Sequence, residues 1–169
     1  MKFIKKLIFF ILFIAIVVIS IALLNGYKHY KNIIENEPLS DKVNTIINDK
    51  NFISLSNVNQ YYIDAVISVE DRRFYLHHGI DFFSLGRAIV NNFKAKELVE
   101  GGSTISQQVA KNLYFITDYS ATRKIPEMFV TFDLEKNYKK NEIFELYMNT
   151  IYFGEGYYGI YAASQRILR

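Results

Sequence analysis

The first strong pattern along the chain is an unbroken apolar stretch over residues 7–24, in which Ser20 is the only polar residue. A helix of about 18 residues, with a rise of about 1.5 Å per residue, is about 27 Å long, close to the hydrocarbon thickness of a bilayer. A helix in a soluble core carries its apolar residues on one stripe, whereas this stretch is apolar all round. The pattern therefore predicts a transmembrane anchor over residues 7–24.

The flanks of this stretch bear on its processing and orientation. A cleaved signal peptide usually has a shorter apolar region followed by small residues, whereas the polar and aromatic residues 25–30 follow it here. We therefore prefer an uncleaved anchor over a signal peptide. Lysines gather in residues 1–6, which predicts a cytoplasmic tail there and places residues 25–169 on the outer face, although Lys28 and Lys31 follow the span.

The rest of the chain divides into a polar segment and one domain. Residues 25–54 are rich in Asn, Lys and Ile and are interrupted by Pro38, so we predict a stalk there. Residues 55–169 are long enough for a single domain. Half of the whole sequence is apolar and aromatic residues are abundant, so this domain can bury a substantial core.

Helical periodicity recurs in the region after the stalk. Ser56 and Asn57 can cap a helix that begins near Val58 and ends at Glu70. A second amphipathic helix is predicted over residues 82–93, and two interpretations of it stay open. Either it faces the core, or it lies on the membrane with its aromatic residues among the acyl chains and its basic residues at the headgroups.

Three more helices complete the predicted domain. One follows a Ser103 or Thr104 cap, one begins near Pro126, and one is capped by Asn141. A glycine- and tyrosine-rich loop then leads to a short piece over residues 160–169. No segment has the alternating pattern of a strand, so the fold is predicted to be mainly α.

Charge and cysteine content narrow the classes of function. The net charge is +3 and the lysines are scattered rather than gathered in one patch, so nucleic acid is not an expected partner. The chain has no cysteine, which excludes disulfides and thiolate metal sites but is compatible with any redox compartment.

The densest cluster of chemical groups lies in residues 70–81, which combine three acids, two arginines, two histidines and a turn glycine. Glu70, at a helix end beside apolar residues, can be partly desolvated and act as a general base, or it can be a structural acid paired with a neighbouring arginine. His77 and His78 are expected to pack and hydrogen-bond rather than bind a metal, because no third ligand is evident. Asp81 is expected to cap the following helix.

A second cluster lies in residues 101–112, where Gly-Gly-Ser-Thr precedes two glutamines and Lys111. It lacks the ending of a P-loop, but a glycine turn, hydroxyls at a helix start and a lysine suit a polyanionic or sugar-phosphate ligand. Arg123 and Lys124 add positive charge, and Glu127 is favoured by the dipole of its predicted helix whatever its function. Two acids beside basic groups are compatible with glycosyl chemistry that expels a phosphate.

The two clusters belong to a set of four motifs that resemble the signatures of the peptidoglycan glycosyltransferases, glycosyltransferase family 51. Proteins of this family occur alone or as the amino-terminal domain of bifunctional penicillin-binding proteins. The resemblance covers about residues 55–163, with Ser106 where Thr is usual and Met148 in place of Leu. The four motifs are Glu70-Asp71-x-x-Phe74-x-x-His77-x-Gly79-x-Asp81, Gly101-Gly102-Ser103-Thr104-Ile105-Ser106-Gln107-Gln108-x-x-Lys111-Asn112, Arg123-Lys124-x-x-Glu127 and Lys140-x-Glu142-Ile143-x-Glu145-x-Tyr147-Met148-Asn149.

This resemblance implies a lysozyme-like, mainly α glycosyltransferase domain that polymerises lipid II by inverting β-1,4 glycosyl transfer, with release of undecaprenyl pyrophosphate. Glu70 would be the catalytic base for the acceptor hydroxyl, and Glu127 would be the second catalytic acid. Glu145 and Asn149 would be structural. The implied substrate-binding residues are Asp71, Phe74, His77, Ser103, Thr104, Gln107, Gln108, Lys111, Asn112, Arg123 and Lys124.

The resemblance also implies a cofactor and partners. A divalent cation, Mg²⁺ or Mn²⁺, would bind mainly through the substrate pyrophosphate rather than through protein side chains. The partners would be lipid II, the growing glycan chain, the bilayer of a bacterial cell membrane and proteins of cell-wall synthesis. Residues 82–93 fall where the family has a mobile, membrane-embedded segment, which favours lipid contact for this helix.

The sequence departs from the family pattern at its end. Family members continue well beyond the element that here spans residues 159–163, so the domain over residues 55–169 is expected to be truncated at its carboxy end. This suggests an alternative function, an inactive family member that binds lipid II or cell-wall partners without turnover. A lytic enzyme fits less well, because the basic residues suit a pyrophosphate leaving group.

Overall fold

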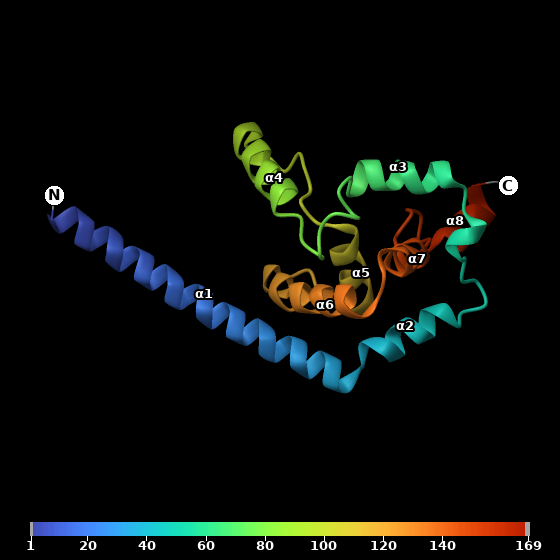
Figure 1. The fold of residues 1–169 in the computed structure, drawn as a ribbon, viewed down its shortest axis with the longest axis horizontal. Helices are drawn as coiled ribbons and strands as arrows, with labels where there is room; N and C mark the ends of the chain where they lie inside the picture. The colour runs from blue at the N-terminus through green and yellow to red at the C-terminus, as the bar shows by residue number, and fades with distance from the viewer. Residues whose placement is uncertain (1, 168–169) are drawn as a thin grey trace.

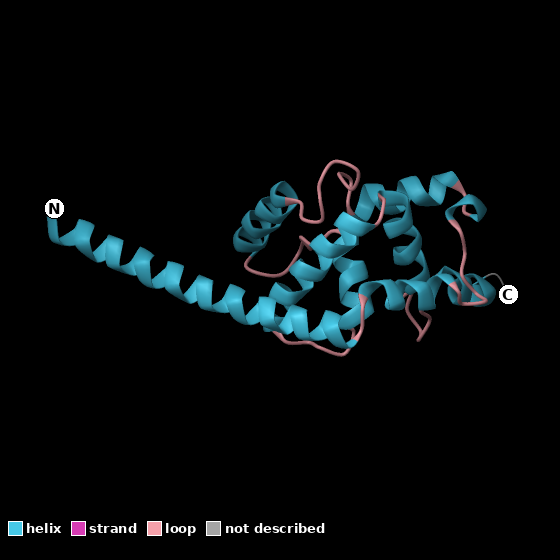
Figure 2. Ribbon diagram, turned by 60° about the horizontal axis from the view of Figure 1, so that its bottom comes forward, coloured by secondary structure: helices cyan, strands magenta, loops and turns pink. Residues whose placement is uncertain are grey.

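The computed structural model describes residues 2–167, and within this range it contains helices and no strand (Figures 1 and 2). Its one piece of β pairing there is an isolated bridge between Tyr152 and Tyr158. The mainly α prediction is therefore confirmed. The elements are α1 (Lys2–Asn36), α2 (Leu39–Ile47), η1 (Leu55–Asn57), α3 (Gln60–Glu70), α4 (Phe82–Ala95), α5 (Ile105–Tyr114), η2 (Ala121–Arg123), α6 (Lys124–Asn137), α7 (Lys140–Thr150) and α8 (Ile160–Ile167).

Helix α5 is the centre of the domain. It packs against α6 on one side and α7 on the other, and α1 packs on α6 (Figure 1). Each fully buried aliphatic or aromatic side chain in such a core contributes about 1.5–3 kcal/mol relative to an exposed one. The buried residues that join α5 to α7 are Ile105, Val109, Leu113, Ile143, Phe144, Leu146, Tyr147 and Met148.

Helix α1 is longer than the predicted anchor. Its first part, which includes residues 7–24, extends away from the domain (Figure 1) and is long and apolar enough to cross a membrane. No part of this apolar window is buried inside the protein, so a bilayer would be the natural environment for it. The helix then continues to Asn36 and joins the domain.

Residues 25–54, predicted to form a stalk, are largely helical and contribute to the core. Leu39 and Val43 of α2 are buried in the main cluster, and Ile34 and Ile46 pack against it. The apolar residues of this segment recur at helical spacing and so form a stripe that the domain covers. Its polar composition conceals that stripe, which explains the difference from the prediction.

Two predicted helix starts also differ from the structure. Residues 55–57 form the short helix η1, and the cap of α3 is Asn59, whose side chain accepts a hydrogen bond from Tyr61 N at 2.9 Å. Helix α7 begins one residue before Asn141, and its first free N–H, that of Lys139, donates to the carboxylate of Glu142 at 2.7 Å. The carboxylate of the third helical residue therefore satisfies an N–H at this helix start, in place of the predicted asparagine cap.

Helix α4 stands apart from the other helices (Figure 1), and Ala88 is its only buried residue within the described range. Phe82, Phe83 and Phe93 are each more than 70 % exposed. The core-facing interpretation of residues 82–93 is therefore wrong. Asp81 caps this helix as predicted, because its side chain accepts hydrogen bonds from Phe83 N and Ser84 N, each at 3.0 Å.

Candidate active site

Glu70 is the last residue of α3, and its carboxylate is exposed. The side-chain amide of Gln108, on α5, donates a hydrogen bond to Glu70 Oε2 at 2.8 Å. The alternative pairing with a neighbouring arginine is not found in the described part of the chain, where Arg73 instead donates from Nε to Asp81 at 2.8 Å. Glu70 is thus oriented by a neutral amide and stays accessible to a ligand.

Two pockets meet at Glu70. We call the first the aromatic pocket; it has a volume of about 580 Å³ and lies between α3 and α7. The second, the polar pocket, has a volume of about 360 Å³ and is bordered by the start of α4 and residues 99–104. Val69, Glu70 and Gln108 line both pockets. A group bound in either pocket would therefore lie beside the Glu70 carboxylate.

Tyrosines and a phenylalanine line the aromatic pocket, and sequence reasoning did not identify them as site residues. Tyr62 comes from α3, Tyr147 from α7, and Tyr152 and Phe153 from the loop after α7. Burial raises the pKa of Tyr147, and the charge of Glu70 raises it further, so the Tyr147 hydroxyl stays protonated. Rings with adjacent hydroxyls are a suitable surface for a sugar, because they offer apolar faces and hydrogen-bond donors together.

The turn before α5 builds one wall of the polar pocket. Thr104 caps α5 by accepting from Gln107 N at 3.1 Å, while Gln107 Oε1 accepts from Thr104 N at 3.0 Å. A side chain at Gly102 would lie 3.3 Å from the backbone of Leu85, so a glycine lets this turn approach α4 closely. Gln107 is buried and occupied by this cap, whereas Ser103, Thr104 and Gln108 line the polar pocket, where their contact with substrate stays a prediction.

Glu127, on the first turn of α6, is fully buried and held between two cations. Lys124 Nζ lies 2.5 Å from Glu127 Oε1, and Arg123 pairs with the other carboxylate oxygen. Lys124 Nζ also donates to Ser103 Oγ at 3.2 Å, which connects this cluster to the wall of the polar pocket. Arg123 Nε is buried and has no hydrogen-bond partner within the described residues.

Phe74 and His77 of the first motif contact the protein and line neither pocket, whereas Asp71 does both. Phe74 is fully buried in the core. His77 Nδ1 accepts from Gly79 N at 3.2 Å, so the proton of a neutral ring is on Nε2, which donates to Asp71 Oδ2 at 2.9 Å. Asp71 Oδ2 also accepts from Ile105 N at 3.1 Å. Through Asp71, the segment that follows Glu70 is attached to the start of α5. Phe74 and His77 thus support the fold, which differs from their predicted role in substrate binding. Asp71 also lines the polar pocket.

The remaining predicted positions divide in the same way. Asn112 donates to the carbonyl of Thr150 at 3.3 Å and so joins α5 to α7. Lys111 is partly buried and lines neither pocket, so its contact with substrate stays a prediction. Glu145 accepts from Leu55 N at 2.7 Å, and Asn149 makes two hydrogen bonds of 2.9 Å to the backbone of Ile53. The structural role expected for Glu145 and Asn149 is confirmed.

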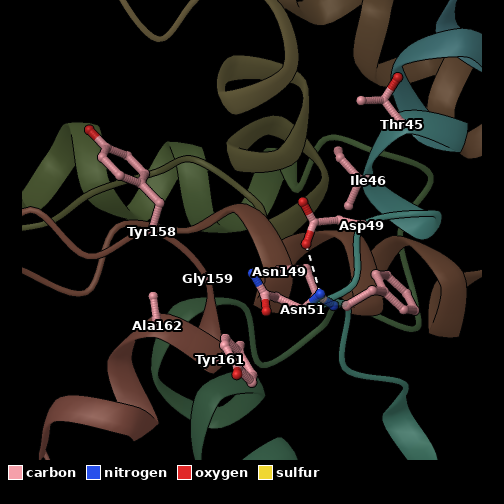
Figure 3. Close-up of a pocket in the computed structure, with 10 residues that line it drawn as sticks. Thr45, Ile46, Asp49, Asn51, Asn149, Tyr158, Gly159, Tyr161 and Ala162 are labelled. Carbon is pink, nitrogen blue, oxygen red and sulfur yellow. Dashed lines mark hydrogen bonds between the residues drawn. The ribbon is translucent and has the colours of Figure 1, made fainter.

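Asn149 also lines a third pocket, which Glu70 does not line (Figure 3). This pocket has a volume of about 270 Å³ and lies between the end of α2, the start of α8 and residues 49–52. It shares no lining residue with the aromatic or the polar pocket. Residues of the first and second motifs thus line the pockets at Glu70, whereas Asn149 of the fourth motif lines this third pocket.

Comparisons with known proteins identify the family of the chain. The family model described as transglycosylase matches residues 38–169. The chain is 45 % identical over 124 residues to a monofunctional glycosyltransferase of Staphylococcus aureus (strain JH9), covering 73 % of this chain and 46 % of that protein. It is 46 % identical over 112 residues to penicillin-binding protein 1F of Bacillus subtilis (strain 168), covering 66 % of this chain and 16 % of that protein.

The chain therefore spans less than half the length of these relatives. The family match nevertheless includes every residue of the two pockets and of the Arg123–Lys124–Glu127 cluster. From the extent of this match and the level of identity to the two relatives, the chain is a member of the transglycosylase family.

Proposed function

We propose that this protein polymerises lipid II into peptidoglycan glycan strands. One observation carries the proposal. Glu70, Gln108 and Ser103 all line the polar pocket, and Gln108 donates a hydrogen bond to the Glu70 carboxylate. Ser103 in turn accepts a hydrogen bond from Lys124 of the Arg123–Lys124–Glu127 cluster. A base on a pocket, and a cationic cluster that contacts the wall of that pocket through Ser103, suit a glycosyl transfer with a phosphate leaving group.

Glu70 acts on the acceptor. Its carboxylate takes the proton from the 4-hydroxyl of the acceptor GlcNAc, and the oxygen attacks the anomeric carbon of the lipid-linked MurNAc. The bond from this carbon to the pyrophosphate oxygen breaks as the new β-1,4 bond forms, so the configuration inverts. We assign the acceptor sugar to the aromatic pocket, because Tyr62, Tyr147 and Tyr152 provide the rings and hydroxyls that suit it.

The cationic cluster acts on the leaving group. The negative charge that develops on undecaprenyl pyrophosphate would be neutralised by Lys124 and Arg123. Glu127 is fully buried between these cations, so its role is to hold them in position before the substrate arrives. We therefore propose that Glu127 is essential as a positioning group rather than as a proton donor.

A divalent cation would also stabilise the pyrophosphate. Within residues 2–167 no group of three or more His, Asp or Glu side chains could hold a metal ion, and Glu127 is already paired with two cations. We propose that Mg²⁺ or Mn²⁺ is held by the pyrophosphate oxygens of the substrate.

The exposed aromatic face of α4 and the apolar part of α1 support an arrangement at a membrane. We propose a single-pass protein of the bacterial cell membrane, with the amino terminus in the cytoplasm, the domain on the outer face and α4 in contact with lipid. The growing glycan chain and proteins of cell-wall synthesis would be its partners at that surface.

The test is polymerisation of fluorescent lipid II by the detergent-purified protein. The unmodified chain should form glycan, and Glu70→Gln, which keeps the shape but removes the base, should lower the rate by at least about 10²-fold. Glu35→Gln is a matched control, because Glu35 is an exposed carboxylate on α1, outside both pockets. Folded, unmodified protein that forms no glycan, or a Glu70→Gln variant as active as Glu35→Gln, would overturn the proposal.

A further inference from the structure

The contact between α1 and α6 depends on a single glycine. Gly26 is the one buried residue of α1 in the described range. A Cβ at this position would lie 2.7 Å from Ile125 Cβ, closer still to Ile125 Cγ2, and 3.5 Å from Pro126 Cδ. The helix backbones can approach this closely only because position 26 has no side chain.

The contacts that follow keep one register along both helices. The ring centroids of Tyr27 and Phe129 are 5.3 Å apart, and those of Tyr30 and Phe129 are 5.7 Å apart. One turn further along α6, the Tyr30 hydroxyl donates to Asp133 Oδ2 at 3.1 Å. Residue numbers rise together on the two helices, so they run in the same direction, as Figure 1 also shows for the lower part of α1.

This register places the start of α6 beside the end of the apolar stretch. Gly26 comes two residues after Leu24, about 3 Å along the helix axis. Its contact Ile125 directly follows Lys124 in the first turn of α6. The cations Arg123 and Lys124 are therefore held close to the level at which α1 would leave the hydrocarbon, which is where the phosphates of a lipid-linked molecule lie.

We infer that Gly26 is a positioning residue, whose contact with Ile125 sets the height of the Arg123–Lys124–Glu127 cluster relative to the bilayer surface. This inference rests on the proposed function for its substrate, a lipid-linked pyrophosphate. A side chain at position 26 separates the helices, tilts α1 against α6 and moves the cluster away from the phosphates. Substrate binding in a bilayer then weakens, while the groups around Glu70 are unchanged.

The test uses three variants. Gly26→Ala introduces the Cβ that contacts Ile125. Gly26→Ala combined with Ile125→Gly removes both Ile125 atoms that this Cβ approaches, and the glycine in the first turn of α6 costs at most about 1 kcal/mol of helix propensity. Asn25→Ala is the control, because it adds the same residue type one position earlier, at an exposed site on α1.

Two readouts separate the inference from the proposed function. The chain has no cysteine, so a spin label on Ala121→Cys, at an exposed site in η2 beside the cluster, reports the depth of that region in vesicles of phosphatidylglycerol and phosphatidylethanolamine. The second readout is the KM and kcat for lipid II in the same vesicles and in detergent micelles, where no flat surface fixes the height of the substrate.

Gly26→Ala should shift the label depth and raise the KM in vesicles about tenfold, with kcat within about twofold and little effect in micelles. The double variant should restore both values, and Asn25→Ala should leave both unchanged. A Gly26→Ala variant with unaltered depth and KM, or one that loses activity equally in micelles, would overturn the inference. If the unmodified chain makes no glycan, the proposed function falls, and the depth readout alone decides whether Gly26 sets the height.

Discussion

The side-chain amide of Gln108 donates to the carboxylate of Glu70 across 2.8 Å, and this contact joins two residues that are 38 positions apart. Gln108 belongs to α5, the most enclosed helix of the domain, whereas Glu70 ends the more exposed α3. The central helix thus fixes the direction in which the carboxylate points. In its proposed role as a base, Glu70 would need little reorganisation before it accepts a proton.

Removal of this amide should slow catalysis without unfolding the protein. In Gln108→Ala the Glu70 carboxylate loses its donor and samples other rotamers, so we expect kcat for lipid II to fall about tenfold, or about 1.4 kcal/mol. The melting temperature should change little, since Gln108 is only partly buried. Gln165→Ala, at an exposed site on α8, is the control. An unchanged kcat would show that Gln108 does not orient the base.

Loss of the buried carboxylate of Glu127 should destabilise the fold. Glu127→Ala leaves Arg123 and Lys124 facing one another near a buried site, so we expect the free energy of unfolding to fall by about 3 kcal/mol. The figure is at the low end for a buried pair because Lys124 is 44 % exposed and can turn to solvent. Urea unfolding followed by circular dichroism measures it, with Glu35→Ala as the control. A loss below about 1 kcal/mol would contradict the structural importance of this pair.

Acid should weaken the attachment of the Asp81 cap. Burial alone would raise the pKa of Asp81, but hydrogen bonds from Arg73 and Ser84 and the charge of Arg73 outweigh it and hold the pKa well below its usual value. A depressed pKa stabilises the folded state above the unfolded value of about 4, and this stabilisation is lost as the pH falls below that value. The unfolding free energy should therefore fall on acidification.

The matching variant is Asp81→Asn, which cannot take a negative charge. Its stability should depend less on pH below about 4 than that of the unmodified protein. Asp64→Asn, at an exposed site on α3, is the comparison. Parallel pH profiles for Asp81→Asn and the unmodified protein would contradict a special contribution of this carboxylate.

Two glycines should respond to alanine in opposite directions. Gly79 has φ +97°, and a Cβ there would lie 2.9 Å from Thr131 Cγ2, so Gly79→Ala should cost about 1–3 kcal/mol in chemical denaturation. Gly86 lies within α4 and a Cβ there meets nothing within 4 Å, so Gly86→Ala should stabilise that helix by about 0.5–1 kcal/mol. Slower amide exchange in α4 would show that Gly86→Ala stabilises this helix. Equal changes in stability for Gly79→Ala and Gly86→Ala would contradict the different roles given to the two glycines.

Local signals in the sequence predicted the elements whose ends depend on local chemistry. Asp81 and Thr104 cap their helices as expected, because an oxygen next to free N–H groups acts within three residues. The motifs likewise identified Glu70 and Glu127 as candidates. The polar composition of residues 25–54 misled the analysis, since burial depends on which side chains share a face and not on their average.

The geometry of the site depends on distant contacts that no local pattern shows. Nothing near Tyr152 or Phe153 indicates that they line a pocket with Glu70, because the loop after α7 reaches it only through the packing of α7 on α5. In the same way, Phe74 packs on the distant Phe144 of α7, and His77 is held by Asp71, which accepts a hydrogen bond from Ile105 N at the start of α5. Motif membership identifies such residues as important but does not separate contact with substrate from support of the fold.

The uncovered aromatic face of α4 determines how the protein can be handled in solution. Removal of residues 1–24 would leave Phe82, Phe83 and Phe93 exposed, so the shortened protein would still require detergent or would self-associate. Removal of all of α1 would be worse, because Tyr30, Ile33 and Ile34 also cover Ala110, Phe115 and Val130. Exposed apolar surface is therefore present on the folded domain as well as on α1. Shortening the chain would not yield a protein that can be purified without detergent or lipid.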